Sequence, residues 1–181
     1  MKIVFISLAA FLFFDASGQH DHQKSVTADT IKKSIPQSIH TEIGDAHIMI
    51  FYTAPVVRGR VIWGGLVPYG EVWVTGAHKA TTWEFTNNIK INNTVIPSGK
   101  YAVFTIPGKE KWIFIVNKKW DQHLADEYDP KEDVLRVEAV PQVMASHQER
   151  LLYSIIEEGN NKGTLTISWE KIKISIPFLV E

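Results

Sequence analysis

Hydrophobic residues come in short runs from about residue 38 onward, and residues that favour turns separate these runs. Apolar and polar residues often alternate within a run, as around Leu165, Ile167 and Trp169, which is the period of a strand with one buried face. Many short strands with frequent turns predict antiparallel β structure, with a helical turn at Trp120–Tyr128. The expected strands are Ser38–Ile43, His47–Thr53, Arg60–Trp63, Glu71–Thr75, Thr81–Thr86, Lys90–Ile91, Lys100–Ile106, Lys111–Asn117, Asp133–Val140, Arg150–Glu157, Thr164–Trp169 and Lys171–Ile176.

Two features of the pattern indicate how these strands are layered. The alternation changes parity between Trp169 and Ile172, which predicts a turn or bulge at Glu170–Lys171. The segments Tyr101–Ile106 and Trp112–Val116 are apolar at nearly every position, so we expect them to be central or covered on both faces. Two stacked sheets satisfy both features. The sequence therefore predicts an antiparallel, jelly-roll-like β-sandwich, with a β-barrel as the alternative.

The first residues have the form of an export signal. A positive start at Lys2 precedes the apolar run Ile3–Phe14, which is too short to span a bilayer, and small residues follow at Ala16–Gly18. We expect a signal peptide over residues 1–18, a polar flexible leader over 19–37 and a single β-sandwich domain over 38–181. The mature chain is then expected in the periplasm or outside the cell, without a transmembrane segment.

Composition narrows the classes of function. Lysine and arginine number 19 and aspartate and glutamate 20, so no net field favours nucleic acid, and no such partner is expected. The chain has no cysteine, which excludes disulfides, thiolate nucleophiles and zinc–thiolate sites. Its histidines are scattered, without the spacing of a metal site. We expect neither a metal site nor a cofactor.

Candidate chemistry gathers around the segment from Gly64 to Phe85. If Val72 and Val74 face the core, Trp73 faces outward or into a groove, where it could stack on a ligand; a half-covered edge tryptophan is the favoured alternative. Arg58 and Arg60 could hold a carboxylate or phosphate, or could fix their own loop by binding carbonyl groups. A histidine at 78 could act as a base, but no serine has the context of a catalytic nucleophile.

Several separated motifs resemble the bacterial domain-of-unknown-function family 2911. They are YTAPVVRGRVIWGGLVPYGEVWVTGAHKATTWEF, IPSGKYAVFTIPG, WIFIVNK, YDPKEDVLRVEA and LTISWEKIKISIP, which together span about Ser38 to Pro177. The resemblance implies an exported bacterial β domain without an assigned activity. The chain departs from the family pattern at Ala54, Val74, His78 and Lys79, where the pattern has arginine, arginine, asparagine and glutamate. It matches the pattern at Arg58, Arg60, Tyr69, Trp73, Thr75, Thr81 and Thr82.

Three functions follow from these observations. The favoured one is a non-catalytic binding or interaction module for a carbohydrate, an envelope component or a protein partner. The alternatives are a hydrolase-like enzyme that uses His78 with Arg58 or Arg60, and a structural envelope component. No catalytic set is assigned. The candidate ligand-binding surface comprises Arg58, Arg60, Tyr69, Trp73, Thr75, His78 and Thr82, and the hypothesis requires that they share one cavity.

Overall fold

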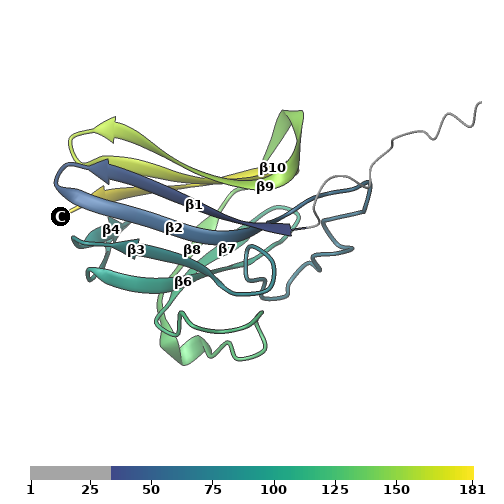
Figure 1. Cartoon of the computed structure of the whole chain (residues 1–181), viewed down its shortest axis with the longest axis horizontal. Helices are drawn as coiled ribbons and strands as arrows, with labels where there is room; N and C mark the ends of the chain where they lie inside the picture. Colours follow the sequence, from purple (N-terminus) through teal and green to yellow (C-terminus); the bar gives the residue numbers. More distant parts are fainter. Residues whose placement is uncertain (1–33) are drawn as a thin grey trace, which may run out of the picture. The chain divides into compact units, whose positions relative to one another are not determined.

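The computed structural model describes residues 34–181, which form two stacked antiparallel sheets (Figure 1). The six-stranded sheet has the order β1-β2-β3-β6-β7-β8, and the four-stranded sheet has the order β5-β4-β10-β9. Neither sheet closes on itself, so the predicted β-sandwich is confirmed and the barrel alternative is not adopted. The strands are β1 Ser34–Ile43, β2 Ala46–Pro55, β3 Thr81–Phe85, β4 Ile89–Ile91, β5 Thr94–Ile96, β6 Gly99–Ile106, β7 Trp112–Asn117, β8 Asp133–Ala139, β9 Gln142–Gly159 and β10 Lys162–Val180.

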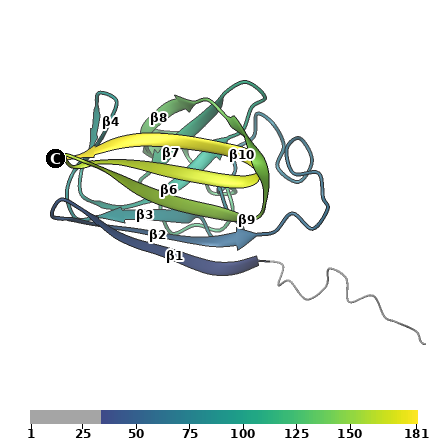
Figure 2. The ribbon, with the colours of Figure 1, turned by 90° about the horizontal axis from the view of Figure 1, so that it is seen from above.

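The main core lies between the two sheets, where the inward residues of each strand meet. Trp83 of β3 and Trp169 of β10 are fully buried there. Burial of one such indole removes about 200 Å² from water, which favours folding by about 5 kcal/mol before entropy costs. Seen from above, β9 and β10 lie over the six-stranded sheet (Figure 2). The alternating apolar positions of the sequence thus account for the sandwich core.

Strand β10 reverses its direction partway along. A straight strand of 19 residues would be about 60 Å long. The N–H of Val180 nevertheless donates to the carbonyl of Asn161 at 2.8 Å, so the end of β10 returns to its beginning. Glu170 has φ of 55°, and the register with β9 shifts on both sides of it. The turn or bulge predicted at Glu170–Lys171 is confirmed, and the two halves lie side by side (Figure 2).

The outer face of β6 and β7 is also covered, by loops rather than by a third sheet. Ala102, Phe104 and Ile115 point outward from these strands and form a second apolar cluster with Val74. Tyr128 packs on the same cluster, and its ring meets that of Phe104 edge-on at 5.1 Å. This second cluster explains why both segments are apolar at nearly every position.

Several expected elements differ from the structure. Residues 60–63 and 71–75 are loops that make only isolated bridges, at Trp63 and Trp73, and residues with positive φ angles flank or end them: Arg58, Gly64 and Thr75. The short strand β5 was not expected. The expected helical turn at 120–128 is replaced by a 3₁₀ turn, η1, at Pro130–Glu132, where Asp129 caps the N–H of Lys131 and proline begins the turn.

The N-terminal boundary of the sandwich also differs from the expected one. Strand β1 begins at Ser34, so residues 34–37, which were expected to belong to the leader, pair with β2. The predicted signal peptide and the rest of the predicted leader lie outside the described residues. Within residues 34–181, no helix has both the length and the apolar character that a membrane span requires.

Candidate functional site

A pocket of about 740 Å³ opens beside the loop that follows β2. Its walls are apolar and include Leu66, Val67, Trp73 and Trp169. Its rim carries three basic side chains, Arg58, Arg60 and His78. The pocket therefore joins residues that are more than 100 positions apart in the sequence.

The wall of this pocket is built from indole rings. The rings of Trp73 and Trp169 stack with centroids 5.7 Å apart and planes 19° from parallel. Trp63 meets each of them edge-on at 5.8 Å. The indole N–H of Trp73 donates to the carbonyl of Gly76 at 3.0 Å, which fixes the ring. Trp73 is therefore a half-covered wall residue and not a freely exposed one, as the favoured alternative expected.

The two arginines lie on a loop that is stabilised by hydrogen bonds within the loop. The guanidinium of Arg60 donates from Nε to the carbonyl of Val57 at 3.1 Å and from Nη2 to the carbonyl of Val56. The loop-fixing role considered for these arginines is thus found at Arg60. Arg58 has φ of 50°, and its backbone N–H donates to Oε1 of Glu149 at 2.8 Å.

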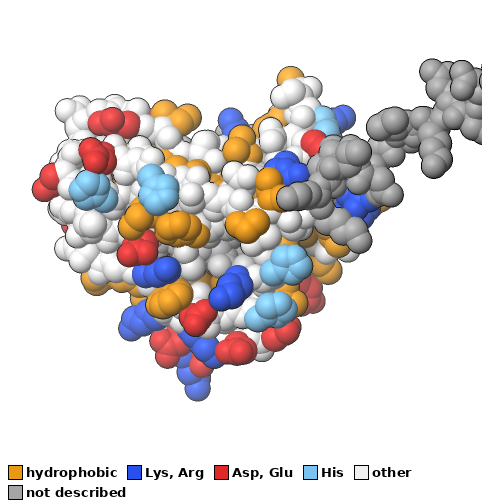
Figure 3. Space-filling view, viewed as in Figure 1, with side chains coloured by type: hydrophobic (Ala, Val, Ile, Leu, Met, Phe, Trp, Pro, Cys, Tyr) orange, Lys and Arg blue, Asp and Glu red, His pale blue; other side chains and the backbone are white. Residues whose placement is uncertain are grey.

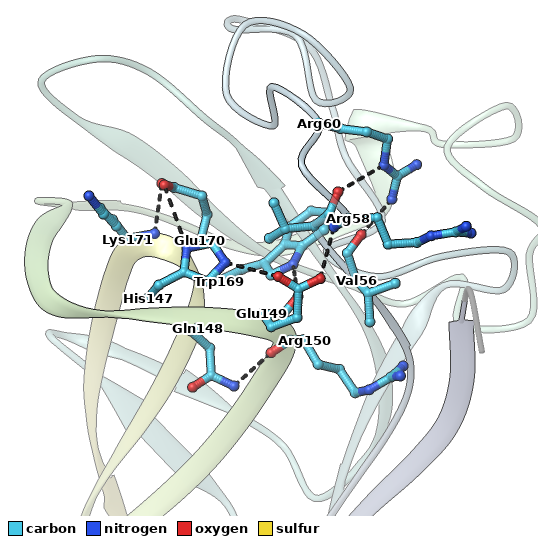
Figure 4. A network of polar contacts seen from close by, with 11 residues as sticks. Val56, Arg58, Arg60, His147, Gln148, Glu149, Arg150, Trp169, Glu170 and Lys171 are labelled. Atoms are coloured by element: carbon cyan, nitrogen blue, oxygen red, sulfur yellow. Dashed lines mark hydrogen bonds and ion pairs between the residues drawn. The ribbon is translucent and has the colours of Figure 1, made fainter. Parts of the chain in front are cut away.

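Glu149 on β9 clamps this loop to the four-stranded sheet (Figure 4). Its carbonyl accepts from the N–H of Val57 at 2.8 Å and from the indole N–H of Trp169 at 3.3 Å. Its carboxylate also lies 3.0 Å from Nε2 of His147. The hydrogen bond from the Arg58 N–H, followed by that from His147, lowers the pKa of Glu149 below its ordinary value. Glu149 therefore connects the arginine loop to Trp169 in the pocket wall through hydrogen bonds.

His78 lines the pocket from the loop that follows Trp73. Its backbone has φ of 65°, and its carbonyl accepts from the N–H of Leu124 at 2.7 Å, which ties two loops together. The imidazole lines the pocket and is exposed. The described residues that line the pocket include no aspartate or glutamate. Among residues 34–181, no three acidic, histidine or cysteine side chains gather closely enough to hold a metal ion.

The family model described as "Protein of unknown function (DUF2911)" matches residues 34–178, which cover both sheets. The chain belongs to this family. No curated protein and no solved structure matches the chain.

Three candidates of the predicted surface do not line the pocket of this DUF2911 chain. Tyr69 packs over Gly64, where a Cβ would lie 2.8 Å from its ring. Thr82 points from the outer face of β3 into a different pocket. Thr75 is fully buried, and its hydroxyl lies 3.0 Å from that of Thr105. The expected seven-residue surface is thus reduced to Arg58, Arg60, Trp73 and His78.

Thr75 nevertheless helps to position the pocket wall. It has φ of 51°, an unfavourable conformation for a β-branched residue. Its carbonyl accepts from the hydroxyl of Tyr153 at 2.7 Å and from that of Thr81 at 3.1 Å. These bonds hold the turn that carries the Gly76 carbonyl, the acceptor of the Trp73 indole. Thr75 therefore positions the Trp73 ring indirectly, by holding the turn at Gly76.

Trp169 and Glu149 were not identified from the sequence as parts of this site. Alternation places Trp169 on an inward face, as found, but does not indicate which loop it will meet. Glu149 lies in an ordinary polar stretch. Its role depends on a contact with Arg58 across 91 residues, for which the sequence carries no local signal.

Proposed function

We propose that this protein is an exported, non-catalytic binding module whose ligand occupies the pocket under Arg58 and Arg60. The observation that carries the proposal is a fixed wall of stacked indoles, Trp73 on Trp169, beneath a basic rim. Such a pocket fits a small molecule with one anionic group and a flat apolar body. Export rests on the signal-like start of the sequence.

The walls and the rim select different parts of that ligand. Leu66 and the half-covered ring of Trp73, which buried Trp169 supports from behind, offer an apolar surface typical of a pocket for a small molecule. Guanidinium groups bind carboxylates and phosphates through a planar fork of donors. The carbonyl bonds of Arg60 already orient its guanidinium, which reduces the entropy lost on binding. A neutral sugar would leave this charge unused.

The hydrolase alternative is less well supported. It would use His78 as a general base, but a base of this kind needs a nucleophile and an orienting acid. Ser34 is the one hydroxyl residue among the described residues lining the pocket, and none of them is acidic.

A purely structural envelope component would gain no stability from any ligand. A ligand-linked rise in melting temperature therefore distinguishes a binding module from a structural component.

The test compares carboxylates with their neutral amides. We expect indole-3-acetate or octanoate to raise the melting temperature, while indole-3-acetamide and octanamide leave it unchanged. At one hundred times the dissociation constant, the stabilisation is about 2.7 kcal/mol, or several degrees for a domain of this size. Calorimetric titration then gives the affinity of the carboxylate that binds.

Arg58→Gln is the decisive variant, because it removes one charge from the rim and keeps the backbone N–H that binds Glu149. We expect it to weaken carboxylate binding about tenfold or more. Lys131→Gln is the matched control, since this exposed residue on η1 lies away from the pocket. If no carboxylate binds, if the amides bind equally, or if Arg58→Gln has no effect, the proposed function is wrong.

A further inference from the structure

A second pocket, of about 360 Å³, lies on the outer face of the six-stranded sheet. Strands β1, β2, β3 and β6 contribute to its floor, and the loop around Trp120–Gln122 forms one side. It shares no lining residue with the pocket under the arginines. Whatever it binds is thus recognised by a separate set of side chains.

Two large aromatic side chains stand exposed at this pocket. Phe51 is 40% exposed and Trp120 is 41% exposed, although burial of either would favour folding. Between them lies Lys100, whose Nζ is 4.4 Å from the ring centroid of Trp120 and 5.7 Å from that of Phe51. Lys100 also pairs with Glu84 at 3.7 Å. The aromatic rings are therefore held in place by a cation and still accessible.

The same pocket has a buried acceptor without a donor. Gln122 is 4% exposed, and its backbone carbonyl accepts from the N–H of Ala80 at 3.0 Å. Its side-chain Nε2 donates to the carbonyl of Lys119. Among the described residues, nothing donates to its Oε1. An unsatisfied buried acceptor costs about 1–3 kcal/mol, so a ligand that donates a hydrogen bond there would be favoured.

The ligand must combine an apolar face with groups that donate and accept hydrogen bonds. Gln122 Oε1 requires a donor, whereas the Lys100 ammonium requires an acceptor, and a hydroxyl group can serve as either. Lys79 pairs with Asp121, and Lys100 pairs with Glu84. The charges around the pocket therefore balance, and they do not favour an ionic ligand. Figure 3 shows basic and acidic side chains intermixed over this face, without a large patch of either sign.

A sugar ring has this combination, with C–H groups on its face and hydroxyls at its edge. We propose that the pocket formed by Phe51, Lys100, Trp120 and Gln122 binds a neutral saccharide. The sugar face packs on Trp120 and Phe51, and its hydroxyls bond to Gln122 Oε1 and to the Lys100 ammonium. This inference does not depend on the pocket under the arginines, because different residues carry it.

The experiment uses maltotriose, cellotriose and chitotriose as probes, measured by calorimetric titration on the folded chain. We expect at least one of them to bind, and Trp120→Ala to weaken it about tenfold or more. Trp120→Phe should restore part of the affinity, because a ring remains. Tyr69→Ala is the matched control, as it removes an aromatic ring that is 40% exposed and lines neither pocket.

Arg58→Gln separates this inference from the proposed function, since saccharide binding should be unaffected by it. Gln122→Leu is a second variant, which removes the unsatisfied acceptor and keeps a side chain of similar volume. It should keep the fold and weaken saccharide binding. The inference is overturned if none of the three saccharides binds or if Trp120→Ala leaves their affinity unchanged.

Discussion

Gly163 shows at the scale of one residue how tightly the two sheets meet. A Cβ at this position would lie 2.5 Å from Cδ1 of Ile43 and 2.6 Å from Cζ of Phe178. Its φ is outside the left-handed region, so the backbone does not require glycine. The requirement is for space, where the first half of β10 passes its second half and the end of β1.

Gly163→Ala should therefore destabilise the protein by about 1–3 kcal/mol, the usual range for an overpacked core. For a domain of about 150 residues, this corresponds to roughly 2–4 °C per kcal/mol in melting temperature. Thermal or urea unfolding measures the change. Adding Ile43→Val removes the clashing Cδ1, so the double variant should lose less stability than the sum of the single variants. Additive losses would contradict the packing explanation.

At the scale of elements, the clamp from β9 to the arginine loop depends on the charge of Glu149. The folded state lowers the pKa of this carboxyl below its ordinary value of 4.5, because the Arg58 N–H and His147 hydrogen-bond to the charged form. A lowered pKa adds stability above the unfolded value, and this stability is lost as the pH falls through the folded value. The clamp should thus weaken only in acid, below about pH 4.5.

Glu149→Gln tests whether the charge of Glu149 stabilises the clamp, because the amide keeps an acceptor for the Arg58 N–H and loses the charge. Near pH 7 we expect a melting temperature about 1–3 °C lower than that of the parent, because the charged carboxylate accepts the Arg58 N–H more strongly than an amide does, and exposed charged contacts contribute about 0.2–1 kcal/mol. The difference should shrink as the pH falls below about 4.5. Glu157→Gln on the same strand is the control for the loss of one carboxylate from β9. A difference that persists in acid would rule out the charge as its cause.

The sequence predicted those elements whose burial is periodic. The alternation around Leu165 and the parity change before Ile172 locate β10 and its reversal, because each strand face is buried or exposed as a whole. It failed at residues 71–75, where Trp73 makes a single bridge to Thr105 and Thr75 then leaves strand geometry. Local hydrophobicity cannot distinguish a strand from an apolar loop that covers a sheet.

The candidate site was predictable only in part, for a related reason. Arg58, Arg60, Trp73 and His78 lie on one stretch of chain, and the fold brings them to one pocket. Trp169, which completes the wall, arrives from another sheet through contacts that no local pattern encodes. Pocket composition therefore depends on long-range pairing.

At the scale of the whole molecule, two of the pockets on the sandwich differ in chemistry. One combines indoles with basic side chains, and the other combines aromatic rings with an unsatisfied amide oxygen. Without disulfides, both depend on the packed core for their rigidity. A protein of this kind could bind two ligands at once without competition.

We propose that the whole chain is exported, and we predict that the signal is removed after Gly18. In a bacterial host that expresses the full sequence, the mature protein should begin at Gln19 and be found in the periplasm or the medium. Intact-mass measurement and cell fractionation check this. A change of Ala16 to a large residue should leave the chain unprocessed, because signal peptidases require small side chains near the cut. An uncleaved parent chain in the cytoplasm would contradict the prediction.

The return of β10 on itself bears on when this protein can fold during its synthesis. In the four-stranded sheet, β10 lies between β4 and β9, and β4 pairs with Leu179 and Val180 of β10, so the sheet is complete only after translation has passed Val180. The strands of the six-stranded sheet and the β4–β5 pair are therefore synthesised before the strand that joins β4 to β9. In the export that we propose, a sheet completed this late would leave the chain incompletely folded when it reaches a secretion channel.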